Sequence, residues 1–556
     1  MATSELDKFF GPRPSGERQR LGVVVGGSLS KGLDVKLDVG ALPGGVIEDM
    51  AVGRYVVVEG ATGRKFFSIV TDIALDSNNP DLAKAPPDPD DDFAAHVYGS
   101  ALAFGRLQVA PMLLLEEGSN TPKPVKTVPA HFSKVFMASE ADVNNVFGAE
   151  DGDHWHIGSP LDMEGVKVNL DLGKFVERSS GIFGKSGTGK SFVTRTILAG
   201  VINANKASCL IFDMHNDYGW EVSAEGGKRR VKGLKQLFNS QVQIVTLDPS
   251  TSASRGVRPD RVLKIGLNQI EPEDVEMLSG ILGLTEVQVG ALYYLRRKLK
   301  NEWIAKLLSD EDDAALDSIE AEGRIQGGTL RAIQRKFEFF NRFEFLQKKA
   351  EDEDINYVFD CLNRGTNIVL EFGKYGDALA AYVFVANFLT RRIHRRYVDR
   401  VNRAMGKQAD EPLPLIIVIE EAHKFLDPQI AQHTIFGTIA RELRKYKVTL
   451  LLIDQRPSGI DEEVMSQVGT RVTCLLDNEA DIRAVFSGVS GAGQLREVLA
   501  RLDTQQQALI LGHAVPMPVV VKTRDYDEAL YAAVGFVEGE ALKAKRERES
   551  KVLFGE

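Results

Sequence analysis

The stretch "GKSGTGKS", residues 184–191, decides the fold. It fits the pattern G-x-x-x-x-G-K-[ST], in which glycines let backbone N–H groups turn inward and approach phosphate oxygens. Lys190 would bring a positive charge to the outer phosphates, and Ser191 would offer its hydroxyl to Mg²⁺. A flexible glycine turn is the alternative. The context favours a phosphate loop, because the short run "GIF" precedes it and apolar residues recur at helical spacing after it: Val193, Ile197, Leu198, Val201 and Ile202.

The pattern along the chain predicts an α/β core. From about residue 165, apolar runs such as "ASCLIFD", "PLIIVIE" and "VTLLLID" alternate with segments of helical periodicity. Strands that alternate with helices are typical of a mainly parallel sheet. A helix-rich stretch of mixed charge between about residues 270 and 355 indicates a helical insertion into this core.

The first part of the chain has a different pattern. Residues 20–75 show Val/Ile/Phe-rich runs separated by glycine-containing turns, which is typical of β-hairpins. The segment "DSNNPDLAKAPPDPDDD" is rich in Pro and Asp and is expected to be an exposed loop. We expect a small β-barrel or sandwich over about residues 1–140, suited to interaction or docking because a closed sheet leaves few free edges.

Composition limits the function classes. The chain has 556 residues, which favours two or three domains, and its net charge of −10 disfavours a generic basic DNA coat, although local basic surfaces are compatible with it. Three scattered cysteines, Cys209, Cys361 and Cys474, argue against a disulfide framework and for a reducing compartment. No early run of about 20 apolar residues predicts a signal or membrane segment. We expect a cytoplasmic protein without a membrane contact.

Two carboxylates follow a continuous apolar run in "LPLIIVIEEAHKF". A run that is apolar on both faces indicates a central parallel strand, and ligands bind at the carboxyl ends of such strands. Glu420 could therefore hold Mg²⁺, through water, and Glu421 could polarise the attacking water. An acid-rich helix start is the alternative, and the phosphate loop elsewhere in the chain makes it the weaker one.

The next strand, "VTLLLIDQRPS", ends at Asp454 and Gln455. The neutral amide of Gln455 could touch the γ-phosphate; an ordinary polar strand end is the alternative. Upstream, Arg444 lies in the basic segment "RELRKYK". It could act as an arginine finger in a neighbouring subunit or be a cation at a helix C-terminus, and spacing does not decide between them. For the basic run at 391–403, a structural role is favoured over contact with DNA.

Other classes fit less well. A GTPase requires N-K-x-D, and "NKAS" at 205–208 lacks the aspartate. The segment "SGAGQ" at 490–494 resembles a transporter signature but lies downstream of the acidic strand, which is the wrong order. No H-E-x-x-H motif or paired C-x-x-C motif supports a zinc site, and "HWH" at 154–156 is interpreted as structural.

Five segments together resemble the HerA/FtsK superfamily of ring ATPases, and HerA proteins in particular, in the family's order: "RSSGIFGKSGTGKS", "LIFDMHNDYGW", "LIIVIEEAHKF", "RELRKYKVTLLLIDQRPSGIDEEVMSQVGTRV" and "ALILGHAVPMPVVVK". The resemblance implies a RecA-like P-loop ATPase core with a parallel sheet and a helical insertion, after an N-terminal HAS-type β-barrel. The expected segments are a docking barrel at 1–140, the first core part at 141–269, the insertion at 270–355, the second core part at 356–525 and a helical tail at 526–556.

The resemblance also assigns site residues. Glu421 matches the catalytic glutamate, Gln455 the sensor and Arg444 the finger that acts in a neighbouring subunit. Asp213 matches an acidic residue expected at the metal, with Ser191 and Glu420, and Arg178 matches an arginine near the nucleotide. The expected nucleotide-binding residues of the loop are Gly184, Ser186, Gly187, Thr188, Gly189, Lys190 and Ser191. "NDYGW" replaces the commoner "GEY", which leaves the role of Asp217 open.

The function implied by the resemblance is a homo-hexameric, ATP- and Mg²⁺-dependent translocase or helicase that threads double-stranded DNA through its pore. A partner nuclease or other effector, NurA-like in DNA repair or a nuclease in phage defence, would dock on the side of the N-terminal barrel. Two alternatives stay open: a scaffold whose ATP binding gates a partner without processive movement, and a motor ATPase of secretion or conjugation.

Overall fold

The computed structural model describes residues 20–536 with internal gaps. Those gaps are 39–49, 61–62, 80, 82–83, 85, 87, 89, 91–102, 117–121, 162, 164, 224–229, 310–312, 432–433, 443–444, 490–491 and 504–505. The predicted arginine finger Arg444, residues 1–19 of the expected barrel, part of the Pro- and Asp-rich loop and residues 537–556 of the expected tail therefore lie outside the described residues.

Six antiparallel strands close an N-terminal barrel. The pairing order is β2, β1, β7, β3, β4 and β5, and β5 pairs with β2 to complete the circle. A short strand, β6, extends the sheet from β5. The strands are β1 (Arg20–Ser28), β2 (Gly32–Leu37), β3 (Tyr55–Glu59), β4 (Lys65–Ser77), β5 (Ala103–Leu115), β6 (Lys123–Pro124) and β7 (Lys134–Met137).

The barrel shares a hydrophobic interface with the rest of the molecule. Side chains alternate along a strand, so Val56 and Val58 of β3 fill the barrel interior while Tyr55 and Val57 belong to the main core. Phe67 of β4 also packs in the main core, and its ring centre lies 5.1 Å from that of Tyr55. The barrel is therefore held by apolar packing as well as by the connecting chain.

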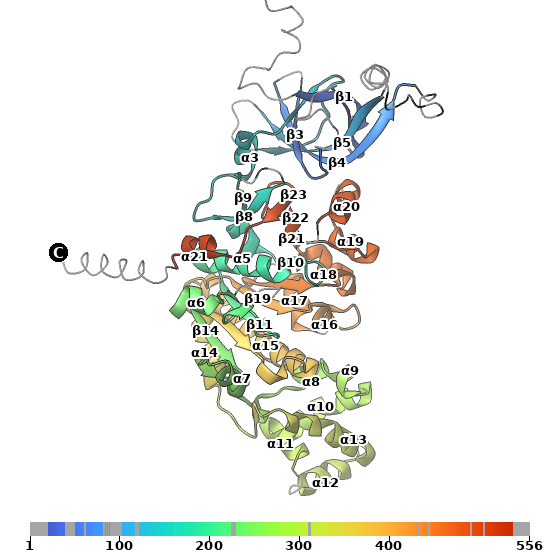
Figure 1. Cartoon of the computed structure of the whole chain (residues 1–556). Helices are drawn as coiled ribbons and strands as arrows, with labels where there is room; N and C mark the ends of the chain where they lie inside the picture. The colour runs from blue at the N-terminus through green and yellow to red at the C-terminus, as the bar shows by residue number, and fades with distance from the viewer. Residues whose placement is uncertain are drawn as a thin grey trace, which may run out of the picture.

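A large mixed sheet forms the centre of the molecule (Figure 1). Its pairs are parallel from β15 to β21 and antiparallel from β21 to β9. In sheet order, the described strands are β15 (Arg261–Val262), β14 (Val242–Thr246), β18 (Asn367–Glu371), β11 (Ser208–Asp213), β19 (Leu415–Glu420), β20 (Val448–Asp454), β10 (Ser180–Phe183), β21 (Thr470–Thr473), β22 (Gln507–Gly512), β23 (Val519–Thr523), β8 (His154–Pro160) and β9 (Val168–Asp171).

Helices cover this sheet, and the strands β11, β19 and β20 are buried along their whole length because both faces are covered. The predicted P-loop α/β fold with a barrel in front is thereby confirmed. The helices outside the insertion are α3 (Glu140–Phe147), α4 (Leu172–Glu177), α5 (Lys190–Asn203), α6 (Leu234–Phe238), α7 (Pro249–Ser254), α14 (Glu353–Asn363), α15 (Leu379–Met405), α16 (His423–Leu426), α17 (Ile435–Glu442), α18 (Glu462–Gln467), α19 (Glu479–Val485), α20 (Ala492–Ala500) and α21 (Glu528–Ala533).

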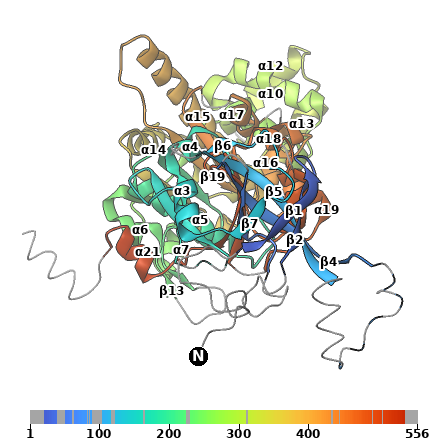
Figure 2. The same cartoon turned by 90° about the horizontal axis from the view of Figure 1, so that it is seen from above.

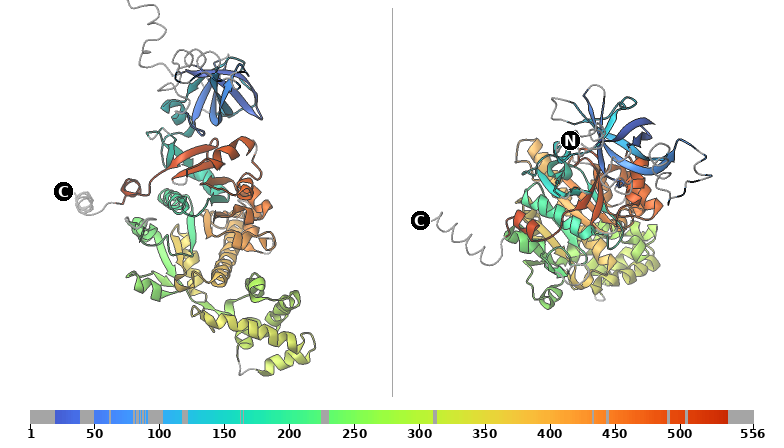
Figure 3. Two further views of the ribbon diagram at one scale, coloured as in Figure 1. Left: turned by 45° about the vertical axis from the view of Figure 1, so that its right-hand side comes forward. Right: turned by 45° about the horizontal axis from the view of Figure 1, so that its top comes forward.

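The helical insertion lies at the end of the molecule opposite the barrel (Figures 1 and 3). Two short parallel strands close its neck, and it has an aromatic core in which the rings of Trp303 and Phe337 lie 5.6 Å apart. The elements are β16 (Ile265–Gly266), α8 (Pro272–Glu276), α9 (Ser279–Leu282), α10 (Glu286–Leu299), α11 (Trp303–Leu307), α12 (Asp313–Ala321), α13 (Gly327–Phe337) and β17 (Leu346–Gln347).

The basic run at 391–403 lies on α15 and begins with a buried ion-pair cluster. Asp274 of α8 is fully buried and accepts hydrogen bonds from Arg391 at 2.6 Å and from Arg392 at 3.0 Å. Arg391 also bonds to Glu271 at 3.1 Å. These contacts join the insertion to the core and agree with the structural role favoured for the start of this run.

The C-terminal part of the described chain runs back across the core. Figures 1 and 2 both show α21 beside α6, and the Tyr531 hydroxyl accepts a hydrogen bond from the backbone N–H of Lys232. None of the helices among the described residues is long and apolar enough to cross a membrane.

Candidate nucleotide-binding site

The glycine-rich loop joins β10 to α5 at the carboxyl edge of the parallel strands. Gly184, Gly187 and Gly189 have φ angles of 153°, 78° and 92°, a region that side chains rarely adopt. At Gly184 an added Cβ would also lie 2.8 Å from the Cβ of Cys474. Glycine is thus required at these positions by backbone conformation, and at Gly184 by space as well.

Hydrogen bonds within the loop hold the side chains of Thr188 and Lys190 in place. The backbone carbonyl of Lys185 accepts hydrogen bonds from the Thr188 hydroxyl at 2.7 Å and from Lys190 Nζ at 2.8 Å. The backbone N–H of Lys185 donates to the carbonyl of Leu475 at 3.0 Å, which attaches the loop to the segment after β21. Lys190 begins α5, so its ammonium group adds to the positive N-terminal end of that helix.

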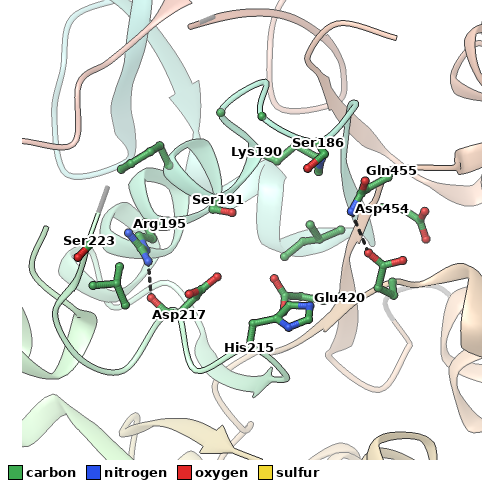
Figure 4. Close-up of a pocket in the computed structure, with 16 residues that line it drawn as sticks. Ser186, Lys190, Ser191, Arg195, His215, Asp217, Ser223, Glu420, Asp454 and Gln455 are labelled. Atoms are coloured by element: carbon green, nitrogen blue, oxygen red, sulfur yellow. Dashed lines mark hydrogen bonds between the residues drawn. The ribbon is translucent and has the colours of Figure 1, made fainter. Parts of the chain in front are cut away.

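A cavity of about 180 Å³ opens beside this loop (Figure 4). It brings together many of the residues predicted from the sequence: Ser186, Gly187, Gly189, Lys190, Ser191, Glu420, Glu421 and Gln455. Side chains that were not assigned a role also line it: Phe192, Arg195, His215, Asp217 and Asp454. Gly184, Thr188, Asp213 and Arg178 are not among the lining residues.

Acidic residues stand at the ends of four neighbouring strands. The register pairs Glu371 of β18 with Asp213 of β11, and Phe212 with Ile419, which sets Asp213 beside Glu420 of β19. Asp454 ends β20, the next strand. Because parallel strands end at one edge of the sheet, these acids form a row that one sequence segment alone does not reveal.

Glu420 has the most unusual environment in this row. It is 9% exposed; its Oε1 accepts a hydrogen bond from the Tyr218 hydroxyl at 3.0 Å, and its buried Oε2 has no hydrogen-bond partner among the described residues. Burial, with the nearby charge of Asp213, raises the pKa of Glu420 to about 8. An unpartnered carboxylate oxygen beside a cavity that also holds the Ser191 hydroxyl suits a hard cation such as Mg²⁺.

Asp213 faces its own loop. Its carboxylate accepts hydrogen bonds from the backbone N–H groups of Asp217 at 2.7 Å and Tyr218 at 2.8 Å. The side chain is fully buried, and burial raises its pKa to about 6. In this position Asp213 supports the turn after β11, and the metal role that the family resemblance assigned to it stays a prediction.

Glu421 and Gln455 lie side by side. Gln455 Nε2 donates a hydrogen bond to Glu421 Oε1 at 3.2 Å, and Glu421 has a positive φ of 48°. Such a backbone is uncommon for a residue with a side chain, and sites of this kind occur often at functional positions. The predicted catalytic glutamate and sensor are therefore adjacent across β19 and β20.

His423 joins the same group, although no role was predicted for it. Its Nδ1 lies 2.9 Å from Asp454 Oδ2 and 3.7 Å from Glu421 Oε2. The backbone N–H of His423 also donates to Asp454 at 2.7 Å. Its position two residues after Glu421 is the one feature of the sequence that could have indicated a role for His423. Its contact with Asp454 could not be predicted, because it depends on the pairing of β19 with β20.

Arg178 lies at the other edge of the sheet. It is exposed and follows α4, just before β10 begins at Ser180, whereas the phosphate loop follows the other end of β10. Four strand residues span roughly 13 Å. The predicted contact of Arg178 with nucleotide is therefore not formed through this cavity and stays a prediction.

Comparisons with known proteins agree with this geometry. Residues 155–393 match the family model described as "Helicase HerA, central domain". The chain is 27% identical over 428 residues to the DNA double-strand break repair helicase HerA of Sulfolobus acidocaldarius, covering 75% of this chain and 78% of that protein. It is 24% identical over 462 residues to the protein of the same name from Pyrococcus furiosus, covering 78% and 80%.

Among solved structures, VirB4 of Thermoanaerobacter pseudethanolicus aligns with a TM-score of 0.46 at 14% identity, covering 69% of this chain and 99% of that chain. The family match includes the phosphate loop, the turn after β11 and the first part of α15, and the similarity to curated HerA proteins extends over most of the chain. Residues 155–393 thus resemble the central domain of HerA helicases, and the fold and the loop that precedes α5 are those of a P-loop ATPase.

Proposed function

We propose that this protein binds Mg²⁺-ATP, hydrolyses it and uses the energy to move along double-stranded DNA as a ring-shaped translocase or helicase. The observation that carries the proposal is the cavity that joins Lys190 and Ser191 to Glu420, Glu421 and Gln455. The relatives named as DNA double-strand break repair helicases support DNA as the substrate.

The residues at the cavity fit the nucleotide and its metal. The backbone N–H groups of the loop and the Lys190 ammonium would hold the phosphates. Ser191 and Glu420 provide the hydroxyl and carboxylate oxygens that would hold Mg²⁺, which when bound neutralises charge on the phosphates. Glu420 lines the cavity, and its buried Oε2 has no hydrogen-bond partner among the described residues.

We propose the following chemical roles in hydrolysis, which the positions of the residues at the cavity support. Glu421 would polarise the attacking water, because a carboxylate accepts a proton better than an amide does. Gln455, which donates a hydrogen bond to Glu421, would contact the γ-phosphate and report its loss. The positive φ of Glu421 would aim its side chain away from the path of β19.

The ring is part of the proposal. A homo-hexamer would let Arg444 of one subunit stabilise charge at the site of its neighbour, as the family resemblance implies. Six copies of a chain with net charge −10 would together carry a large negative charge. The DNA path must therefore be a locally basic pore, since phosphate contacts dominate DNA affinity. A cytoplasmic location stays a prediction from the sequence.

We also propose that a partner nuclease or other effector, in DNA end processing or phage defence, docks on the barrel side. Phe132, beside β7, is 72% exposed on the barrel and suits such a contact. Deleting the barrel would uncover its apolar interface with the main core, so Phe132→Asp is the better test. A nuclease that co-purifies with the wild type should be lost from this variant while ATP turnover is retained; equal co-purification would contradict docking at this surface.

The motor is tested with purified protein on DNA duplexes that carry a protein roadblock. We expect DNA to stimulate ATP turnover and ATP to drive roadblock clearance or strand displacement, and Lys190→Ala to lose both. ATP turnover without movement, together with nucleotide-dependent control of a partner, would instead indicate an ATP-gated scaffold. Membrane or coupling-protein contacts would indicate a secretion or conjugation motor.

A further inference from the structure

We propose that Asp217 is a further acidic residue of the Mg²⁺-ATP site, where its carboxylate holds water of the cation's hydration shell on the side of Ser191 and Glu420. This inference rests on the proposed function and deepens it. Asp217 lies in the turn after β11, in the segment "HNDYGW", which has no assigned role.

The main chain of Asp217 is held from two sides. Its N–H donates to the Asp213 carboxylate at 2.7 Å, and its carbonyl accepts a hydrogen bond from the Arg195 guanidinium on α5. Asp213 and Arg195 are both almost completely buried. Because both polar groups of the Asp217 main chain are anchored, the position of its side chain is set before any ligand arrives.

The side chain of Asp217 lines the same cavity as Ser191 and Glu420 (Figure 4). Within the described part of the chain, no hydrogen bond or ion pair occupies its carboxylate, although the Arg195 guanidinium is nearby and bonds to the main-chain carbonyl instead. A carboxylate that only stabilised the fold would be expected to pair with this arginine. The carboxylate of Asp217 is therefore able to interact with a ligand in the cavity.

A second observation indicates a cation at this place. Glu420 is 9% exposed and lines the cavity, and its Oε2 is buried without a partner among the described residues. Asp217, on the turn after β11, and Glu420, at the end of β19, both line this cavity. Two carboxylates that repel each other across a cavity are stabilised when a divalent cation lies between them.

Water-mediated contact is the form that suits Mg²⁺. This ion keeps several of its waters and is usually bound through one or two carboxylates together with substrate phosphates. Asp217 would then orient the hydrated ion, with Ser191 and Glu420 on its other sides. A carboxylate close to nucleotide phosphates would weaken binding by repulsion if no cation lay between them, and this difference provides the test.

The test measures binding of a fluorescent ADP analogue to the full-length protein at increasing Mg²⁺ concentration and in EDTA. For Asp217→Asn we expect the Mg²⁺ concentration at half-maximal enhancement to rise about 10-fold or more, as for other residues that support a bound metal. Binding in EDTA should be unchanged or tighter, because a negative charge has been removed. A smaller side chain, Asp217→Ser, should give the same result and serves as the second variant if the amide perturbs folding.

Glu221→Gln is the matched control, since Glu221 lies in the same loop and is paired with Arg230 at 3.3 Å, outside the cavity. It should keep the wild-type Mg²⁺ dependence. An unchanged Mg²⁺ midpoint in folded Asp217→Asn and Asp217→Ser would overturn the inference while leaving the proposed function intact. Wild-type protein that binds the ADP analogue without any Mg²⁺ dependence would also overturn the inference, whereas loss of DNA-stimulated ATP turnover in the wild type would overturn the proposed function.

Discussion

The Tyr382 hydroxyl on α15 lies 3.0 Å from both the backbone N and the backbone O of Glu420. It accepts a hydrogen bond from the N–H and donates one to the carbonyl, and it is fully buried. The next residue is Glu421, whose φ is 48°. Tyr382 thus holds the last peptide of β19 immediately before the strained residue that would activate water.

Tyr382→Phe should lower ATP turnover more than ATP affinity. Loss of the hydroxyl leaves two buried backbone groups without this partner, which costs about 1–3 kcal/mol for each unsatisfied group. We therefore expect a lower free energy of unfolding. We also expect Glu421 to be displaced, which would slow hydrolysis. Steady-state turnover, ATP affinity and chemical denaturation measure the three effects.

Tyr375→Phe is the control for this prediction. The Tyr375 hydroxyl accepts a hydrogen bond from the Glu344 backbone N–H at 3.1 Å, near the neck of the insertion. Its loss should reduce stability without a selective loss of turnover. Equal turnover in Tyr382→Phe and the wild type would show that the hydroxyl does not position Glu421.

Lys190→Ala should abolish ATP turnover in a folded protein. The backbone amides of the loop remain, but the charge that neutralises the outer phosphates is lost. Lys185→Ala is a matched control in the same loop, because its side chain forms an exposed ion pair with Asp477 at 2.6 Å, and exposed ion pairs contribute little to stability. Turnover close to that of the wild type in Lys190→Ala would remove the phosphate-loop assignment.

Glu421→Gln should retain Mg²⁺-ATP and hydrolyse it poorly, since an amide is a weak proton acceptor. Glu420→Gln should instead weaken the Mg²⁺ dependence of nucleotide binding, because Glu420 provides the unpartnered oxygen at the cavity. Single-turnover hydrolysis and Mg²⁺ titrations separate the two effects. The opposite result, with slow hydrolysis only in Glu420→Gln, would reverse the two roles.

Glu371→Gln should change how stability depends on pH. Burial, with the nearby charge of Asp213, raises the pKa of Glu371 to about 7; in the unfolded chain it is about 4.3. Between these two pH values the folded state binds more protons than the unfolded state, so the free energy of unfolding falls as pH rises. Glutamine at position 371 does not titrate, so the variant should not show this fall.

The free energy of unfolding of Glu371→Gln, relative to that of the wild type, should therefore rise by on the order of 1–3 kcal/mol between pH 5 and pH 8.5 in the absence of nucleotide. Urea denaturation at both pH values measures this gain. Glu344→Gln removes an exposed acid paired with Lys374 and should show no comparable gain. A difference between Glu371→Gln and the wild type that is constant with pH would contradict a raised pKa of Glu371.

Arg444→Ala should cripple turnover, since a trans-acting finger contributes about 10³–10⁵ in rate, with little loss of ATP affinity. Mixing it with Lys190→Ala should restore partial activity, because some sites then combine an intact Lys190 with a neighbour's intact Arg444. Exchange of subunits is verified first with differently labelled chains. If activity does not recover after verified exchange, Arg444 acts within its own subunit, or hydrolysis at one site requires every site of the ring to be intact.

The sequence by itself determined the local parts of this protein. "GKSGTGKS" predicted the loop, because glycine spacing and a following helix are properties of neighbouring residues. The apolar runs predicted β11, β19 and β20, because strands covered on both faces need no polar positions. The barrel and the insertion were also visible as changes in local pattern.

Only the tertiary structure decided which acids meet. Asp213 and Asp217 are four residues apart in a promising motif, but backbone hydrogen bonds engage the carboxylate of Asp213, and the side chain of Asp217 lines the cavity. Tyr382 and Glu420 are 38 residues apart and are joined by the packing of α15 against the end of β19. Local pattern predicts that a strand ends in an acid, whereas strand register and loop anchoring determine what that acid faces, because both depend on contacts between distant segments.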